Sequence, residues 1–155
     1  KGLYRQGYAS TQEPDEDYVI PFGKGRLVSA GDTISIITWG AMVQKSVEAV
    51  KSLELDDGLI EIIDLRTLNP LDIDMIKKSV EKTGKALIVY EDNVTNGPGA
   101  EISAIISEQC FEFLDGPIKR IASKDSPVPF NWFLEEKVVP QAEDIALGIK
   151  ELMEY

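Results

Sequence analysis

The sequence predicts an α/β protein, a three-layer α/β/α sandwich with a mainly parallel sheet. Apolar, β-branched runs such as TISIITW (33–39) recur along the chain, and such runs are typical of strands buried on both faces. Segments with apolar residues at helical spacing separate these runs. Strands that alternate with amphipathic helices imply right-handed crossovers, which place helices on both faces of a parallel sheet.

Each element is predicted from its own stretch of sequence. The strands are expected where β-branched and apolar residues are concentrated: a short one within 25–31, then 33–39, 59–65, 85–91 and 117–123. The helices are expected where apolar residues recur at helical spacing: 41–53 with Val43, Val47 and Val50, a second with Ile73, Ile76 and Val80, a third with Ile102, Ile106, Cys110 and Phe113, and a last at 142–154.

Residues 1–22 show neither the helical nor the strand period. Gly, Ser, Thr and Pro surround an acidic run from Glu13 to Asp17. We therefore expect an extended linker or lead-in at 1–22, with its acidic run in solvent, and one domain at 23–155.

Three neighbouring residues predict where the second helix begins. Asn69 precedes a proline, which favours the extended backbone that an N-cap residue adopts. Pro70 suits the first helical position, and Asp72 in the first turn meets the positive end of the helix dipole. Replacing Asn69 with Ala is therefore expected to cost about 1 kcal/mol through loss of the cap.

The charge and the missing histidines exclude several classes of function. The chain has 16 Lys and Arg against 27 Asp and Glu, a formal net charge of −11, which disfavours nucleic acid or an anionic membrane and favours a basic partner. Without histidine, the chain cannot form a Ser-His or Cys-His catalytic pair of its own. One cysteine and no histidine leave only oxygen ligands for a metal.

Polar residues follow the expected strands, at the sheet edge where open α/β proteins bind ligands. Asp64, Glu91, Asp92 and Lys124 are the residue types of a phosphoacceptor receiver domain, which holds magnesium and an aspartyl phosphate. Such domains place their acidic pair after the first strand, whereas the first strong strand here ends in Thr-Trp-Gly. Asp64 and Arg66 are therefore interpreted as scaffold.

The stretch TNGPGAEI (95–102) places two glycines at a helix start, as a phosphate cradle does. Pro98 removes one amide from such a cradle, and the nearby Glu91 and Asp92 would repel an anion. A tight turn that leads into a helix is the interpretation we adopt.

Two further features concern single side chains. Cys110 lies on the apolar stripe of its helix, which predicts a buried structural thiol rather than a nucleophile. Trp132 and Phe133 follow a proline-rich loop, where large aromatic residues either fold back onto the core or anchor a partner. The sequence leaves these two alternatives open.

Five stretches together resemble one family: LYRQ (3–6), DEDYVIPFGKGRLVSAGDTISIITWGAMV (15–43), IEIIDLRTLNPLD (60–72), GPGAEISAII (97–106) and DSPVPF (125–130). They are similar to the C-terminal portion of the β subunit of thiamine-diphosphate-dependent 2-oxo acid dehydrogenases, the E1 components. The resemblance covers nearly the whole chain and implies the fold of the transketolase C-terminal domain. Many relatives carry His where this chain has Tyr90, so no role of that histidine is transferred.

The resemblance implies a role in assembly. In this family thiamine diphosphate and Mg²⁺ lie between two other domains, so this segment is expected to hold no catalytic, cofactor-binding or metal-binding residue. The parent enzyme is expected to decarboxylate a 2-oxo acid on thiamine diphosphate and to pass the acyl group to the lipoyl arm of E2, whereas the isolated fragment is expected to be inactive. Its location is expected to be the cytoplasm, or the mitochondrial matrix in a eukaryote.

The implied partners are other E1 domains and subunits, α and β, in an oligomer, and the typically basic peripheral subunit-binding domain of the E2 acyltransferase. The candidate contact residues lie at strand ends, in the aromatic loop and on the last helix: Asp64, Arg66, Glu91, Trp132, Phe133, Glu143, Asp144, Glu151 and Glu154. The alternative for the acidic residues of the last helix is that they form a polar face exposed to solvent and contact no partner. Two other identities stay open, a stand-alone α/β binding module and the same domain of transketolase or deoxyxylulose-phosphate synthase.

Overall fold

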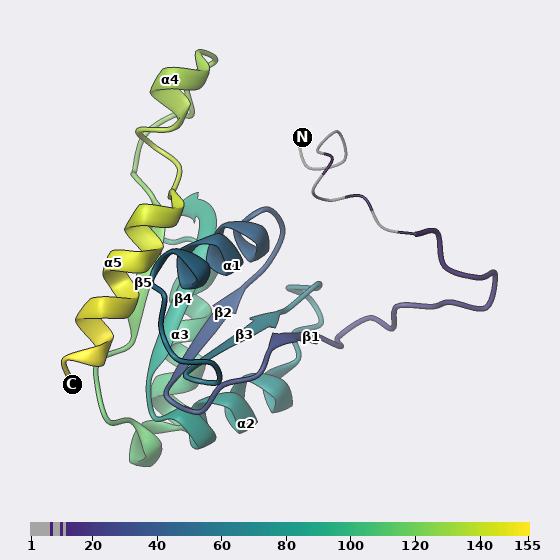
Figure 1. The fold of residues 1–155 in the computed structure, drawn as a ribbon, viewed down its shortest axis with the longest axis vertical. Coiled ribbons are helices and arrows are strands. Elements are labelled where there is room, and N and C mark those ends of the chain that lie inside the picture. Colours follow the sequence, from purple (N-terminus) through teal and green to yellow (C-terminus); the bar gives the residue numbers. More distant parts are fainter. Residues whose placement is uncertain (1–6, 8–9, 11) are drawn as a thin grey trace.

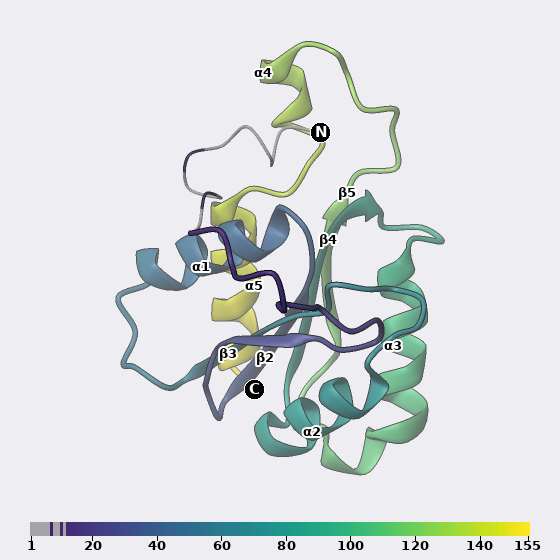
Figure 2. The ribbon, with the colours of Figure 1, turned by 90° about the vertical axis from the view of Figure 1, so that its right-hand side faces the viewer.

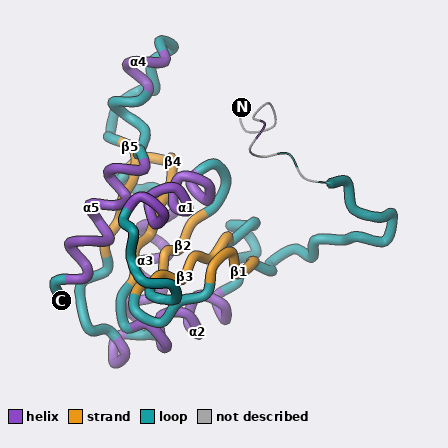
Figure 3. Tube along the Cα trace, in the orientation of Figure 1, coloured by secondary structure: helices purple, strands orange, loops and turns teal. Residues whose placement is uncertain are grey.

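A computed structural model describes residues 7, 10 and 12–155 and confirms the predicted α/β class. The strands are β1 (Arg26–Ser29), β2 (Ile34–Thr38), β3 (Ile60–Asp64), β4 (Ala86–Asn93) and β5 (Lys119–Ser123). The helices are α1 (Met42–Ser52), α2 (Ile73–Thr83), α3 (Pro98–Gln109), the 3₁₀ turn η3 (Phe111–Phe113), α4 (Trp132–Glu135) and α5 (Ala142–Met153). Figures 1 and 3 show their arrangement.

The sheet has the order β1-β3-β2-β4-β5 and is mainly parallel, as predicted. Strand β2 pairs in parallel with both β3 and β4, and β4 pairs in parallel with β5. The short strand β1 is antiparallel to β3 and forms one edge. Helices α1 and α5 pack together on one face, and α2 and α3 pack on the other (Figure 2).

The central strand β2 explains how two helical layers share one sheet. All five of its residues are buried. Ile34 and Ile36 belong to the core under α1 and α5, whereas Ile37 belongs to the core under α2 and α3. Because successive side chains of a strand point to opposite faces, a strand between two helical layers needs apolar residues on both.

The prediction that Asn69 caps the second helix is wrong. Helix α2 begins at Ile73, and the cap is Asp72, whose Oδ1 accepts a hydrogen bond from the Met75 amide at 3.2 Å. Its Oδ2 also accepts a hydrogen bond from the Gly25 amide at 3.0 Å, which positions the residue directly before β1. Asp72 is buried and can satisfy two backbone donors, whereas Asn69 is exposed and lies too far before the helix. The Asn69–Pro70 peptide bond is cis.

Two segments project from the packed body (Figure 1). Residues 12–22 are exposed and fall within the segment expected to be a linker, whose residues 1–6, 8–9 and 11 lie outside the described part. Residues 124–140 leave the carboxyl end of β5, form α4 at their tip and return to α5. We call residues 124–140 the aromatic arm. Across the described part of the chain, no helix has the length and apolar character needed to span a bilayer.

Candidate partner interface

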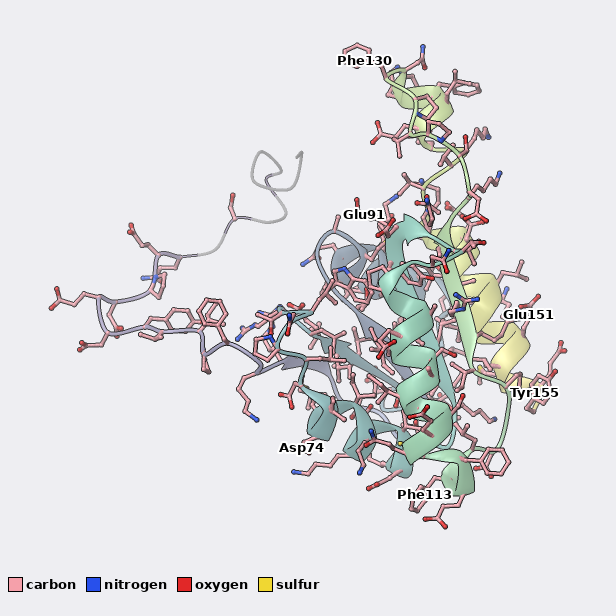
Figure 4. The ribbon with its side chains drawn as sticks, turned by 180° about the vertical axis from the view of Figure 1, so that it is seen from behind. Asp74, Glu91, Phe113, Phe130, Glu151 and Tyr155 are labelled. Atoms are coloured by element: carbon pink, nitrogen blue, oxygen red, sulfur yellow. The ribbon has the colours of Figure 1, made fainter. Side chains whose placement is uncertain are left out.

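The carboxyl edge of the sheet has a switch point between β2 and β4, because the chain moves to β3 on one side of β2 and to β4 on the other. Trp39 follows β2 there, and its ring stacks on Tyr90 with centroids 5.5 Å apart and planes at 14°. Tyr90 is fully buried, while Glu91, the next residue, is exposed at the same edge (Figure 4). Aromatic packing therefore fills the position where this fold often binds a ligand.

The glycines of TNGPGAEI serve this packing. Gly97 is the N-cap of α3, Pro98 opens the helix and Gly99 lies against the Tyr90 ring. A Cβ atom at either glycine would overlap the ring or the backbone beside it. The interpretation as a tight turn and helix start is confirmed, with close packing as the reason for the glycines.

Asp64 and Arg66 lie in a backbone turn at the end of β3. The Asp64 Oδ1 atom accepts a hydrogen bond from the Arg66 amide at 3.1 Å, and its Oδ2 lies 3.7 Å from Nη2 of Arg26. Arg66 adopts the left-handed backbone conformation, with a φ of 57°. These contacts support the scaffold interpretation, because the carboxylate holds the turn and the start of β1.

The residue types of a receiver domain are present but do not assemble into its site. Asp125, which follows β5 at the same edge, is bonded instead to the loop after β4. It accepts hydrogen bonds from the Thr95 amide at 3.1 Å and the Thr95 hydroxyl at 2.6 Å. The hydroxyl bond first, and then the amide bond, lower the pKa of Asp125. Within residues 12–155, no three His, Cys, Asp or Glu side chains come together as a metal site.

The same edge does not fit thiamine diphosphate with its magnesium ion. Glu91, Asp92 and Asp125 present carboxylates that would repel a diphosphate, and the described residues supply no cluster of ligands for the metal. We therefore derive no chemical step through this cofactor on the present chain.

Trp132 and Phe133 lie on α4, at the tip of the aromatic arm. Their exposed fractions are 69% and 55%, so the alternative in which they fold back onto the core is wrong. The two limbs of the arm are joined where the Lys124 amide donates to the Val138 carbonyl at 3.1 Å. Helix α4, which carries both aromatic residues, lies away from the packed body (Figures 1 and 2).

The acidic candidates on the last helix do not form one patch. Asp144 accepts a hydrogen bond from the Gln141 amide at 2.9 Å in a capping box, with Glu143 exposed beside it at the helix start. Glu151 lies near the other end and forms an ion pair with Lys119 of β5. The structure brings Glu143 and Asp144 toward the arm and leaves Glu151 apart.

A groove at the opposite, amino end of the sheet was missed by the sequence analysis. It has a volume of about 830 Å³, and its lining includes exposed Phe111 and Tyr155 with the acidic residues Glu112 and Asp115. We call it the aromatic groove. The assignment of Phe113 to the buried stripe of α3 is wrong, because the helix ends at Gln109 and Phe113 is partly exposed on η3.

Cys110 is buried directly after α3, as predicted. Burial raises the pKa of its thiol, the charge of Glu81 raises it further, and Lys77 acts in the opposite direction. A thiol in this state is a packing residue and a poor nucleophile.

Residues 23–145 match the family model of the transketolase C-terminal domain. The chain belongs to this family. A solved split-gene transketolase, described as an inactive β4 tetramer, superposes with a TM-score of 0.74 over 90% of this chain and 44% of its own. At 24% sequence identity, that likeness shows the shared transketolase C-terminal fold alone.

Two curated relatives are closer in sequence to this transketolase C-terminal domain. The chain is 43% identical over 150 residues to the pyruvate dehydrogenase E1 component subunit beta of Staphylococcus aureus, and 40% identical to that of Staphylococcus epidermidis. Each match covers 96% of this chain and 46% of the relative, so the chain spans about half the length of these relatives. These findings confirm the resemblance to E1 β subunits.

Proposed function

We propose that this chain is the C-terminal domain of the β subunit of a thiamine-diphosphate-dependent 2-oxo acid dehydrogenase. The complete subunit, with its α partner, would decarboxylate a 2-oxo acid and pass the acyl group to the lipoyl arm of E2. The observation that carries this proposal is the 43% identity to an E1 β subunit across 96% of the chain. Identity to the solved transketolase is only 24%.

In this proposal the present domain serves assembly, and the cofactor is held elsewhere in the enzyme. The acidic carboxyl edge and the stacked Trp39 and Tyr90 rings support this division, because they leave no complementary site for a magnesium diphosphate. Candidate contacts for other E1 domains are Asp64, Arg66, Glu91, Trp132 and Phe133, all at the carboxyl edge or on the arm.

An activity assay tests the proposal. The isolated chain should give no turnover with a 2-oxo acid, thiamine diphosphate, Mg²⁺ and an artificial electron acceptor. The complete subunit with its α partner should turn over in a cofactor-dependent manner. Turnover by the isolated chain above background would refute the proposal that the cofactor is held outside this domain. An inactive complete pair would refute the enzyme assignment.

The corresponding domain of transketolase or deoxyxylulose-phosphate synthase is the second candidate, and the shared fold is the observation that favours it. A sugar-phosphate substrate separates the two candidates. Ketol transfer by the complete protein, without decarboxylation of 2-oxo acids, would support the second. A non-enzymatic module would be inactive with both substrate classes.

We also propose the aromatic groove as the docking place of the basic E2 module. Exposed Phe111 and Tyr155 offer apolar anchors, and Glu112 and Asp115 supply charge opposite to that of a basic partner. The α5 carboxylates are also candidate contacts, but Glu151 is less available to a partner because it is already paired with Lys119.

Binding of the E2 peripheral subunit-binding domain to the complete E1 tests the groove. Phe111→Ala should weaken binding about tenfold or more, and Asp115→Asn should weaken it while reducing its salt dependence. Glu143→Gln, at the other end of α5, is the control and should leave the affinity unchanged. If only Glu143→Gln weakened binding, the docking site would be the start of α5 and not the aromatic groove.

A further inference from the structure

Asn96 is the only asparagine in the chain that precedes a glycine. The others, Asn69, Asn93 and Asn131, precede proline, valine and tryptophan. The side-chain amide of an asparagine can react with the backbone nitrogen of the next residue. Glycine hinders this approach least because it has no Cβ, and proline has no N–H to give up. The sequence therefore favours this reaction at the Asn96–Gly97 pair.

The structure leaves both reacting groups of this pair without a hydrogen bond. Asn96 is exposed in the turn between β4 and α3, where its backbone is left-handed with a φ of 60°. In the described part of the chain, neither its side chain nor the Gly97 amide has a hydrogen-bond partner. The Val94 amide, which follows Asn93, donates to the Ser123 carbonyl at 3.0 Å. Of these two asparagines in one loop, only Asn96 is followed by an unbonded backbone nitrogen.

Contacts on both sides of Asn96 restrain the turn. The residue before it, Thr95, is held by Asp125 through its amide at 3.1 Å and its hydroxyl at 2.6 Å. We call these two hydrogen bonds the Asp125 clasp. Gly97 is buried, and a Cβ atom there would overlap the Tyr90 ring and the backbone at the end of β4. Because ring closure requires rotation about the bonds that join the pair, the turn must open locally before it reacts.

We propose that Asn96 is a site of spontaneous deamidation and that the Asp125 clasp limits its rate. The Gly97 nitrogen gives up its proton as it bonds to the side-chain carbonyl carbon of Asn96, the bond from that carbon to Nδ2 breaks, and ammonia leaves with the proton. Water then opens the resulting cyclic imide at either carbonyl, which leaves aspartate or isoaspartate. The net change consumes water and releases ammonia, with no oxidation or reduction.

The two products affect the fold differently. Aspartate keeps the main chain unchanged and adds a negative charge just before α3, where the helix dipole favours it. Isoaspartate lengthens the main chain by a methylene group between Thr95 and Gly97, which are both restrained. The extra length disrupts either the Asp125 clasp or the packing of Gly97 on Tyr90. The isoaspartate form is therefore expected to be less stable than the aspartate form.

Peptide mass spectrometry tests the inference after the folded chain is incubated in mildly alkaline buffer at physiological temperature. Fragments that contain Asn96 should gain about 1 Da, the change from amide to acid. The gain should be about fivefold or more faster than at Asn93, since the hydrogen bond of the Val94 amide must open there first. Asn96→Gln should show no gain at this position on the same timescale. A rate at Asn96 no greater than that at Asn93 would overturn the proposal.

Variants of the clasp test what limits the rate. Asp125→Ala removes both hydrogen bonds and should raise the rate at Asn96 about threefold or more, and Thr95→Val, which removes one, should raise it less. Ser126→Ala is the matched control, because that hydroxyl bonds only to the Pro127 carbonyl, and it should leave the rate unchanged. An unchanged rate in Asp125→Ala would overturn the role of the clasp.

Thermal unfolding tests the consequence for the fold. Aged chain rich in isoaspartate should unfold a few degrees below the Asn96→Asp variant, which carries the same charge on an unaltered main chain. Equal midpoints would contradict the restraint on both sides of Asn96. None of these measurements depends on catalysis, so their outcome is independent of the proposed function.

Discussion

At the scale of single residues, the buried Tyr90 ring explains both the glycines before and within α3 and the stacked Trp39 at the sheet edge. Arg120 also reaches this ring, because its Nη1 atom donates to the Tyr90 hydroxyl at 3.4 Å.

Replacing Gly99 with Ala should lower the free energy of unfolding by about 1–3 kcal/mol, because the added Cβ would overlap the Tyr90 ring. In a Tyr90→Leu background the same change should be neutral or stabilising by up to about 1 kcal/mol, since alanine favours helix over glycine. Urea unfolding of the four proteins in the cycle measures this. An equal cost in both backgrounds would contradict the packing account.

Cys110 gives a prediction about reactivity. Because the folded state raises the pKa of this thiol, the protonated group favours folding, and that contribution declines as the pH rises through the ordinary pKa toward the raised value. At pH 8 the thiol should react with a disulfide reagent about 100-fold more slowly in the folded protein than in urea. Equal rates would show that the thiol is accessible in the folded state.

At the scale of elements, the start of α2 depends on Asp72. Asp72→Ala should cost about 1–2 kcal/mol, because the carboxylate satisfies the amides of both Met75 and Gly25. Asn69→Ala is the matched control and should change stability by less than about 0.5 kcal/mol, as an exposed residue outside the cap. Thermal unfolding of the two variants measures both losses of stability. A larger loss for Asn69→Ala than for Asp72→Ala would show that Asn69 is the cap.

The elements that were predicted well are the strands in which several consecutive residues are buried. Strand β2 is buried at all five residues and β4 at its first five, and most of these residues are apolar because helices cover both sheet faces. Helix α4 has only four residues, too few for a helical period, so the sequence indicated a loop there. The cap was misplaced because Asn-Pro and Asp72 both satisfy local rules, and the sequence does not show which side chain accepts from the Met75 amide and the distant Gly25 amide.

The candidate interface was predictable only in part. The sequence could indicate that Trp132 and Phe133 are unusual, but their exposure depends on whether the body offers a place for them. The aromatic groove combines Phe111 with Tyr155, which are far apart along the chain, so no local sequence pattern predicts the groove. Its one local signal was Phe111, an aromatic residue directly after the end of α3.

At the scale of the whole molecule, the two exposed aromatic features lie at opposite ends of the sheet. The arm continues from the carboxyl end of β5, and η3 beside the groove precedes the amino end of that strand. Figure 4 shows Phe130 and Phe113 at these two ends. The aromatic arm and the aromatic groove are therefore separate surfaces, so a partner at one need not cover the other.

The central claim is that this domain supports assembly while the cofactor is bound elsewhere in the enzyme. Calorimetric titration with thiamine diphosphate and Mg²⁺ tests it most directly, on the isolated chain and on the complete β subunit with its α partner. We predict no saturable binding to the isolated chain and saturable binding to the complete pair. Stoichiometric binding of the cofactor to the isolated chain would contradict the account.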